Sequence, residues 1–343
     1  MVRNTILLFG GDSNERLVSV ASAMAMAQAL GSSKLWFWHN NGPIYEVDYD
    51  QLLAHQDPFT KDFLPHHGPL FGTVEEAISA KACEGYTFVL GVHGGKGENG
   101  YLQTLLEKCQ RPFTGSNAKA SITAFNKIAT KECLLNYQIK MAPHLVLETT
   151  DDLRIAPLLK DFLKDHKELI IKPICGGSSL GCLVIKRLDH IDAAIAEMMK
   201  FFPEPFLAEK FIQGREFSVG AIEDDNGLIA LPCTEIVLEK GRDFDYQGKY
   251  LGLGAKEITP AKLKDSTARD AQRMAIAAHA ALSLDGYSRT DMILAKDGFY
   301  FLETNTLPGL TKQSIVPQQL AAAGITMRAF LETQIKLAGR RRY

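Results

Sequence analysis

The first hundred residues hold the feature that most constrains the fold. An apolar run over residues 5–9 ends at Gly10-Gly11 and is followed by a helical stretch over 18–30. A strand, a glycine turn and a helix in this order begin a layer of parallel strands covered by helices. A later predicted strand, 87–92, runs into a second glycine-rich loop, 93–100. Because ligands bind beyond the carboxyl ends of such strands, both glycine loops are candidate sites.

The middle of the chain is richer in predicted β-structure. An apolar strand over 169–173 leads into the glycine-rich loop 174–181, and the chain returns as a strand over 182–186. This order predicts a hairpin whose glycine tip offers backbone N–H groups to phosphates. A single helix is predicted over 121–136. The polar stretch 241–256 is too long for a simple connection, and we interpret it as a lid.

Composition excludes several classes of protein. The 343 residues carry a net charge of −2 and 46% hydrophobic residues, which is ordinary for a globular chain of two or three domains. A broad nucleic-acid surface is disfavoured, and any polyanionic ligand must be met by a local cluster of cations. The six cysteines form no Cys-x-x-Cys pair, which indicates reduced thiols. Since no apolar stretch is long enough for a membrane span, we expect a cytoplasmic protein with no nucleic-acid or membrane partner.

A hairpin near the end of the chain has the most informative polar pattern. Its turn, Lys296–Gly298, reads as a three-residue loop that pairs residue 295 with residue 299. The same register places Asp291 opposite Glu303.

Alternation of side chains gathers polar groups of this hairpin on one face. The residues expected there are Arg289, Asp291 and Ile293 on the first strand and Phe301, Glu303 and Asn305 on the second. Two carboxylates and an amide oxygen are hard ligands that suit Mg²⁺ carrying a polyphosphate. The alternative is a polar, salt-bridged sheet face without a metal.

Two lysines supply the opposite charge. Lys172 ends an apolar strand, and Lys210 lies inside the apolar run 207–212. A lysine in an apolar strand is costly unless it is paired, so the alternative role for Lys210 is an ion pair with Glu209 or Glu216. Together with the glycine tip and the carboxylate pair, the lysines favour ATP as the ligand.

Two common phosphate-binding loops are missing from the sequence. The G-x-G-x-x-G fingerprint does not follow the first strand, and G-x-x-x-x-G-K-[ST] does not occur. A nicotinamide-dependent dehydrogenase is therefore disfavoured, and a nucleotide site between two β-layers is favoured. Glu15, after the first glycine loop, by itself indicates a helix-start acidic residue more than a ligand.

Taken together, the motifs resemble those of the D-alanine–D-alanine ligases of the ATP-grasp superfamily. The most specific segment is ETNTLPGLT at 303–311 with Ser314, preceded by GYSRTD at 286–291. Further matching segments cover essentially the whole chain in order: 7–15, 92–103, 112–116, 126–127, 171–173, 177–181, 209–210, 214–216, 249–250 and 260–261.

The resemblance implies a fold that is α/β and α+β, in a three-domain ATP-grasp architecture with the nucleotide between two β-containing domains. The implied boundaries are 1–116 for an α/β N-terminal substrate domain, 117–207 for a central ATP-grasp subdomain and 208–343 for a C-terminal catalytic domain.

The resemblance also implies roles for single residues. ATP would be held by Lys127, Lys172, Glu209, Lys210, Ile212, Glu216 and Lys249. Two Mg²⁺ (or Mn²⁺) ions would be bound by Asp291, Glu303 and Asn305. The implied catalytic residues are Glu15, Ser178, Tyr250, Arg289, Gly309 and Ser314. Among these, Ser178 and Tyr250 would link Glu15 to the lid.

The catalytic residues divide between the two amino acids. Glu15 would receive the ammonium group of the first D-alanine, and Ser314 the carboxylate of the second. Arg289 and the Gly309 N–H would face the developing oxyanion. The implied activity is ATP-dependent joining of two D-alanines through an acyl phosphate for peptidoglycan precursor synthesis, and homodimers are usual in the family.

The chain departs from the family pattern at Leu17, Asn99, Cys175, Gly176 and Phe244. None of these departures removes a metal ligand or a nucleotide lysine, but they cluster near the amino-acid subsites. Two alternatives therefore stay open: an ATP-grasp ligase that joins a different pair of amino acids, and a nucleotide-binding relative without turnover.

Overall fold

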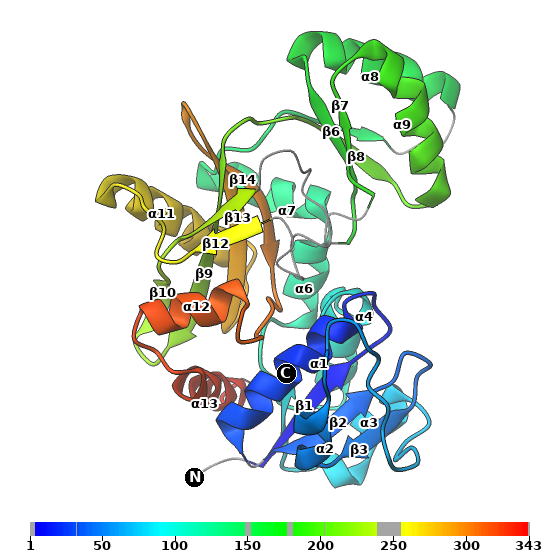
Figure 1. Ribbon diagram of the computed structural model, residues 1–343, viewed down its shortest axis with the longest axis vertical. Helices are drawn as coiled ribbons and strands as arrows, with labels where there is room; N and C mark the ends of the chain where they lie inside the picture. Colours follow the sequence, from blue (N-terminus) through cyan, green and yellow to red (C-terminus); the bar gives the residue numbers. More distant parts are fainter. Residues whose placement is uncertain are drawn as a thin grey trace.

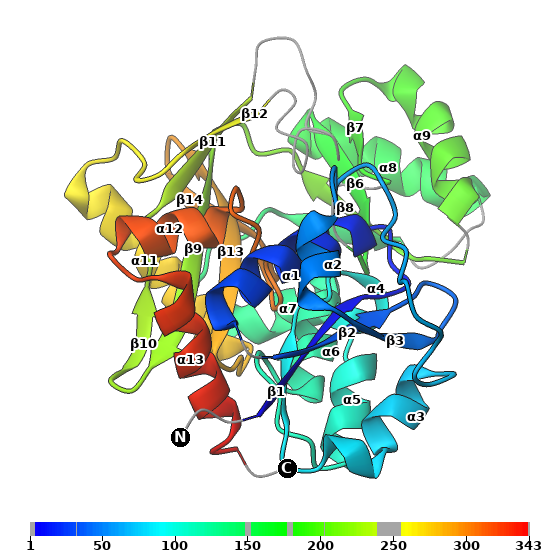
Figure 2. The same ribbon diagram turned by 60° about the horizontal axis from the view of Figure 1, so that its bottom comes forward.

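Three β-sheets form in the part of the chain that the computed structural model describes, namely residues 4–31, 33–147, 152–176, 181–201, 203–238 and 255–341. Each sheet has helices of its own (Figure 1). Turned by 60°, the molecule shows the second sheet above the first at the right, with the third sheet at the left (Figure 2).

The first sheet is the predicted parallel layer. Its strands run in the order β3-β2-β1-β4, with β1 parallel to both neighbours, and they are β1 (Thr5–Gly10), β2 (Lys34–Trp38), β3 (Ile44–Val47) and β4 (Thr87–Leu90). The helices of this unit are α1 (Arg16–Leu30), α2 (Tyr49–Ala54), α3 (Val74–Ser79), the 3₁₀ turn η1 (Lys81–Cys83), α4 (Gly95–Glu98) and α5 (Tyr101–Lys108). All six residues of β1 are buried, as in a sheet covered on both faces.

The first glycine turn requires its glycine. Gly10 has a φ of +95°, and a Cβ there would lie 2.3 Å from the Trp38 carbonyl oxygen. The chain turns at this point toward α1, which places the following residues beyond the carboxyl end of β1.

The second sheet is antiparallel and lies in the middle of the chain. It has the order β5-β8-β6-β7, with strands β5 (His144–Leu147), β6 (Leu169–Pro173), β7 (Leu183–Ile185) and β8 (Phe206–Lys210). Its helical elements are α8 (Asp152–His166), η3 (Leu188–His190), α9 (Ile191–Met198) and η4 (Met199–Phe201). Because β8 pairs with β5 and β6, the predicted boundary at 207 falls inside a strand, and this sheet continues to Lys210.

The third sheet carries the C-terminal half. Its order is β12-β11-β9-β13-β14, with β10 paired to β9, and its strands are β9 (Arg215–Asp224), β10 (Gly227–Ala230), β11 (Thr234–Leu238), β12 (Ala255–Ile258), β13 (Tyr287–Ala295) and β14 (Gly298–Asn305). Its helices are α11 (Asp265–Ala281), α12 (Ile315–Ala322) and α13 (Met327–Ala338). One face packs on α11, where Phe217, Val219 and Met292 meet alanines of that helix. The opposite face of this sheet does not pack on α11.

The single helix predicted over 121–136 is wrong: the segment forms α6 (Ala118–Phe125) and α7 (Lys127–Leu134), followed by η2 (Leu135–Tyr137). The break lies at Asn126, whose Oδ1 accepts from the backbone N–H groups of Ile128 and Ala129 at 2.9 and 3.0 Å. This is an N-cap, which satisfies donors at the start of a new helix. The break also lets the Lys127 N–H donate to the Ile174 carbonyl at 3.0 Å.

These two helices pack on the third sheet, although the expected central subdomain began at 117. Their buried side chains share a small core with α11 and β14, formed by Ala120, Leu134, Ile139, Ala278, Leu282, Leu284 and Phe301. The second sheet therefore keeps only residues from about 144 to 210 around its own core.

The first and third units share one hydrophobic core. Side chains from the last two helices, such as Val316 and Phe330, belong to the same buried cluster as Ile6 and Leu7 of β1. Helix α13 lies beside α1 (Figure 1). The second unit has a separate core, built around Leu159 and Ile171 among others.

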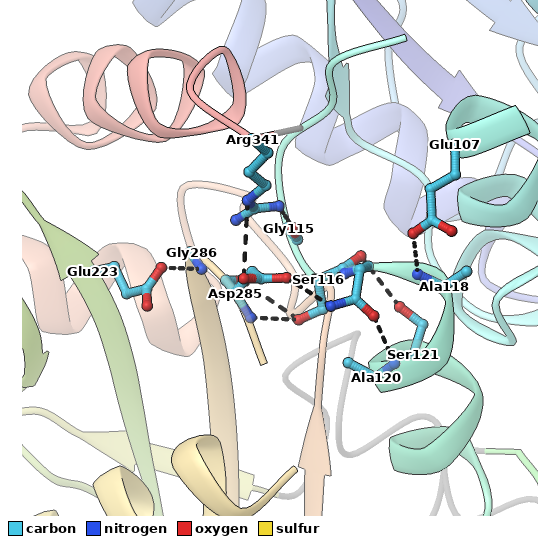
Figure 3. Close-up of polar contacts among 11 residues, drawn as sticks. Glu107, Gly115, Ser116, Ala118, Ala120, Ser121, Glu223, Asp285, Gly286 and Arg341 are labelled. Carbon is cyan, nitrogen blue, oxygen red and sulfur yellow. Dashed lines mark hydrogen bonds and ion pairs between the residues drawn. The ribbon is translucent and has the colours of Figure 1, made fainter. Parts of the chain in front are cut away.

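A polar junction fixes the start of β13 against the link that follows the first unit (Figure 3). The Asp285 carboxylate accepts from the Asn117 backbone N–H and Nδ2 at 3.3 and 3.0 Å. The Asp285 N–H donates to the Ser116 Oγ at 3.2 Å, and Arg341 lies 3.9 Å from the same carboxylate. The next residue, Gly286, donates to Glu223 Oε2 at 2.7 Å. The strand that carries Arg289 and Asp291 is thus anchored by the two residues that precede it.

Among the described helices, none has the length and apolar character needed to cross a bilayer.

Candidate active site

A cleft of about 480 Å³ lies where the three units meet. Its lining comes from both glycine loops, the α6–α7 break, the end of β6, the segment before β8 and the end of β14: Asp12, Ser13, Asn14, Glu15, Gly94, Gly95, Glu98, Ala124, Phe125, Lys127, Pro173, Cys175, Gly176, Phe201, Glu204, Glu303, Thr304, Asn305 and Thr306. Four residues predicted for the site, Glu15, Lys127, Glu303 and Asn305, therefore line one cavity although they lie far apart in the sequence.

The hairpin at the floor of the cleft has the predicted pair but a different turn. Ala295 pairs with Gly298 rather than with Phe299, so the turn is one residue shorter than predicted. A β-bulge at Leu302 then shifts the register, and Asp291 lies opposite Glu303 as predicted.

The bulge also changes which side chains share a face. Met292 pairs with Phe301, and both are buried on the side of the helices, so the prediction that Phe301 shares the face of Glu303 is wrong. Below the bulge, Glu303 pairs with Asp291 and Asn305 with Arg289. These four polar residues lie on one face because paired residues point to the same side of a sheet.

Asp291 is the most enclosed of these four residues, at 3% exposure. Arg289 donates to both its oxygens, from Nε at 2.9 Å and from Nη2 at 2.7 Å. The Ser218 hydroxyl donates to Oδ1, and Asn305 Nδ2 lies 3.5 Å from Oδ2. The carboxylate is therefore fixed in place by Arg289, whose charge offsets the cost of burying it.

The donor set of this face fits a hard cation. In the described part of the chain no three His, Cys, Asp or Glu side chains gather as a metal cluster. The hairpin instead offers two carboxylates and an amide oxygen, and two of these, Glu303 and Asn305, open to the cleft. Such a set leaves coordination positions for phosphate oxygens, as Mg²⁺ in nucleotide sites requires.

Behind the cleft lining, near Lys127, lies a positive cluster whose centre is Glu209 on β8. The Lys131 ammonium lies 2.5 Å from Glu209 Oε1, and Lys172 is paired with Oε2. All three side chains are at most 10% exposed. Burial opposes ionisation of Glu209, but the two lysines outweigh it and lower its pKa. The partner that the sequence suggested for Glu209, Lys210, is replaced by these two lysines.

Lys127 stands at the first position of α7 and reaches the glycine loop. Its Nζ donates to the Gly176 carbonyl at 2.7 Å. Burial lowers the pKa of Lys127, and the Glu303 carboxylate opposes this shift. Lys127 is thus the cation that faces both the glycine loop and the carboxylates.

The two glycine loops converge on Glu15. A Cβ at Gly94 would lie 2.5 Å from Glu15 Oε2, so the carboxylate rests on the second loop. Burial, together with Glu15, raises the pKa of Glu98 to about 8. Burial lowers the pKa of His93, which donates from Nδ1 to the Leu307 carbonyl at 2.9 Å and lies 2.8 Å from the Ser22 Oγ through Nε2.

The loop after β14 brings Gly309 and Ser314 together. A side chain at Gly309 would meet the Ser314 Oγ at 2.8 Å. The Thr311 N–H lies 3.2 Å and its hydroxyl 2.7 Å from the same Oγ. Ser314 precedes α12 without capping it through its side chain, so its hydroxyl is oriented by the loop.

The remaining predicted residues lie away from the cleft lining or outside the described residues. Lys210 and Ile212 lie at the end of β8 and just after it, and Glu216 lies on β9 opposite Ile293. Ser178, Lys249 and Tyr250 fall outside the described residues, as does the predicted lid except for its last two residues.

The sequence motifs did not predict that Lys131 and Glu98 belong to the site. Lys131 lies four residues after Lys127, so helical spacing placed both on one face of a helix. Glu98 stands within the second glycine loop, where only the fold brings it next to Glu15.

Comparison with known proteins gives one consistent family. A model described as "D-ala D-ala ligase N-terminus" matches residues 4–116, and one described as "D-ala D-ala ligase C-terminus" matches residues 133–336. A D-alanine–D-alanine ligase of Syntrophobacter fumaroxidans is 39% identical over 97% of this chain and 96% of its own. One from Leptospira interrogans is 30% identical over 98% of each chain.

Solved structures agree on the fold. D-alanyl-alanine synthetase A from Vibrio cholerae matches 99% of this chain and all of its own, with a TM-score of 0.80 and 25% identity. The VanG D-Ala:D-Ser ligase from Enterococcus faecalis also has a TM-score of 0.80, at 24% identity, over 98% of this chain and all of its own.

Proposed function

Because the chain belongs to the D-alanine–D-alanine ligase family, we propose that it joins two D-alanines with the energy of ATP, giving D-alanyl-D-alanine, ADP and phosphate for the peptidoglycan precursor. The observation that carries the proposal is the single cleft lined by Glu15, Lys127, Glu303 and Asn305. It offers an ammonium ligand, a phosphate ligand and metal ligands to one space.

The chemistry explains why one cleft needs all three. An amine cannot displace oxide from a carboxylate, so a carboxylate oxygen of the first D-alanine attacks the γ-phosphorus of ATP, and ADP leaves. The nitrogen lone pair of the second D-alanine then attacks the carbonyl carbon of the acyl phosphate. The tetrahedral intermediate collapses by breaking the bond between carbon and the phosphate oxygen. A C–N bond replaces it, and the amine's proton is lost to solvent.

ATP would lie against the positive cluster. Lys127 and Lys172 would face its phosphates, and Glu209 would keep Lys172 in place. Phosphoryl transfer depends mainly on positioning and charge neutralisation, which these buried cations supply. The resemblance adds Lys210, Ile212, Glu216 and Lys249 as further nucleotide contacts.

The metal would be held by the hairpin. Asp291, Glu303 and Asn305 would bind Mg²⁺ or Mn²⁺, two ions in the family pattern, and the metal would neutralise phosphate charge when bound. Arg289, fixed on Asp291, would stay close to the developing oxyanion.

The amino acids would lie between the first unit and the loop after β14. Glu15 would receive the ammonium group of the first D-alanine. Ser314 would bind the carboxylate of the second, with the Gly309 N–H facing the oxyanion. Ser178 and Tyr250 would link Glu15 to the lid and help to exclude water from the acyl phosphate.

A cytoplasmic homodimer fits the same proposal. ATP, the energy source, is available in the cytoplasm, which supports this location, and dimers are usual in the family. Sedimentation of the purified protein measures the oligomeric state directly.

The proposal is tested by coupled ADP release across pairs of D- and L-amino acids, with the product identified by mass. We expect ADP release with D-alanine alone and a product with the mass of the D-alanine dipeptide. ADP release with another pair but not with D-alanine would show that the enzyme joins that other pair of amino acids. Nucleotide binding without any ADP release would point to a relative that has lost turnover.

A further inference from the structure

One half-buried carboxyl group on the cleft side of the third sheet has no role in the proposed function. Glu257 lies on the edge strand β12 opposite Ile236 of β11, which in turn lies opposite Glu216 of β9. Glu216 pairs with Ile293, two residues after Asp291 on β13. Since paired residues share a face and residues two apart on a strand do as well, Glu257 lies on the face of Asp291.

Glu257 is bonded to the first turn of α12. Gln318 Nε2 donates to Glu257 Oε2 at 2.5 Å, and the Gln318 Oε1 accepts from the Thr259 hydroxyl at 3.3 Å. The Thr259 and Thr234 hydroxyls are themselves 2.7 Å apart. The Gln318 side chain is thus held at both ends of its amide by strands β11 and β12 and the residue after β12.

The same amide reaches the loop that carries Ser314. Gln318 Nε2 also donates to the Gln313 carbonyl at 2.7 Å. Gln313 directly precedes Ser314, whose hydroxyl is fixed on its other side by Thr311 and lies against Gly309. The path from Glu257 to the Ser314 hydroxyl therefore consists of two hydrogen bonds and one residue of backbone.

The polar and charged groups around Glu257 favour a fixed position of its carboxyl group. Burial raises its pKa, while the Gln318 hydrogen bond and the Arg289 charge oppose that shift and Asp291 adds to it. A carboxyl group is rarely buried unless its position serves a purpose or its partners compensate it. Here Gln318 compensates the carboxyl group of Glu257, and Gln318 also fixes the loop that carries Ser314.

We propose that Glu257 and Gln318 are positioning residues for the second amino acid: together they fix the Gln313 carbonyl and, through it, the Ser314 hydroxyl. The inference rests on the proposed function only in that Ser314 receives the acceptor's carboxylate. Small errors in the position of such a group weaken binding of its ligand strongly. The pair therefore acts on the acceptor and leaves ATP and the first D-alanine unaffected.

The test is steady-state kinetics of Gln318→Leu with Gln272→Leu as the matched control. Gln272 also donates from Nε2 to a backbone carbonyl, that of Leu231 at 3.1 Å, but on α11 behind the sheet. We expect Gln318→Leu to raise the KM for the second D-alanine about tenfold, as the loss of two hydrogen bonds implies. The KM values for ATP and the first D-alanine should change less than twofold, and Gln272→Leu should leave all three unchanged. Glu257→Gln, which still offers Gln318 an oxygen, should rescue most of the effect seen in Glu257→Leu.

A second measurement does not depend on activity. Hydrogen exchange of the Ser314 amide, which donates to the Thr311 carbonyl at 3.1 Å, should speed up about tenfold in Gln318→Leu and stay unchanged in Gln272→Leu. An unchanged acceptor KM with unchanged exchange overturns the inference, as does an equal rise in all three KM values. If wild-type protein is inactive with D-alanine, the proposed function fails, whereas the exchange measurement still decides whether Glu257 and Gln318 fix the loop.

Discussion

The two charged walls of the cleft balance their charges differently. The lysine wall (Lys127 at the cleft, with Lys131, Lys172 and Glu209 behind it) has three cations and one buried carboxylate, which pairs with two of them. The carboxylate wall (Arg289, Asp291, Glu303 and Asn305) has one cation paired to the more buried of two carboxylates. The first wall can meet a triphosphate directly, whereas the second can meet it only through a cation. The contrast explains why a nearly neutral chain can hold a polyanion.

The walls also differ in how the chain builds them. The carboxylate wall belongs to one hairpin, β13–β14, and is anchored through Asp285 to the link that follows the first unit (Figure 3). The lysine wall joins α7, which packs on the third sheet, to β6 and β8, which have a separate core. One wall is therefore a local structure, and the other exists only when two units are in contact.

The largest expected effect breaks the carboxylate wall. Asp291→Asn removes a charge that Arg289 and the metal would share, and we expect turnover to fall about 10³-fold. ADP release at saturating ATP and D-alanine measures it. Asp297→Asn, on the exposed turn of the same hairpin, is the control and should retain turnover. If Asp291→Asn keeps more than a tenth of the wild-type rate, this wall is not needed for catalysis.

The next effect breaks the lysine wall. Glu209→Gln leaves two buried lysines without a carboxylate, and we expect the free energy of unfolding to fall by about 3 kcal/mol. Urea denaturation measures the change. Glu197→Gln, which breaks a surface pair with Lys200, should cost at most about 1 kcal/mol. Equal losses of unfolding free energy in the two variants would show that the buried ion pair stabilises the fold no more than the surface pair.

A third change separates nucleotide binding from amino-acid binding. Lys127→Met removes the cation on the glycine loop, and we expect the Kd for ATP to rise about tenfold. The KM for D-alanine should hardly change. Titration of the variant with ATP measures the first, with Lys119→Met on the exposed side of α6 as the control. A tenfold change in the KM for D-alanine instead would move Lys127 from the nucleotide to the amino acids.

The last effect depends on pH and concerns the third side of the cleft, next to Glu15. The pKa of Glu98 is raised to about 8 in the folded protein, above its ordinary value of 4.5. The folded state therefore binds more protons than the unfolded state, and stability is lost as pH rises from 4.5 to 8. Glu98→Gln removes this loss, so the variant should be more stable than wild type at pH 8 and equally stable at pH 4. Urea denaturation at both pH values checks this, and Glu84→Gln at an exposed site should show no such difference.

The sequence predicted the carboxylate wall better than the lysine wall, for physical reasons. Alternation along two neighbouring strands is local, so Asp291 and Glu303 could be paired from spacing alone. The predicted pair is correct although the predicted turn is wrong, because the bulge at Leu302 offsets the shorter loop. Bulges have no clear sequence signal. Phe301 changed faces for the same reason.

The lysine wall depends on contacts between units, which periodicity cannot supply. The break at Asn126 follows from a capping side chain and from the Lys127 bond to Ile174, almost fifty residues away. Lys131 lies on the helix that begins after that break and pairs with Glu209 on β8. The partners of Glu98 and Glu257 are likewise distant in the sequence.

The most direct test of the account follows an oxygen atom through the cleft. The central claim is that the lysine wall and the carboxylate wall bring the γ-phosphate of ATP to the carboxylate of the first D-alanine. With D-alanine labelled by ¹⁸O in its carboxylate, the account predicts that each released phosphate carries one ¹⁸O atom, measured by mass spectrometry. Unlabelled phosphate, released together with the dipeptide, would contradict it.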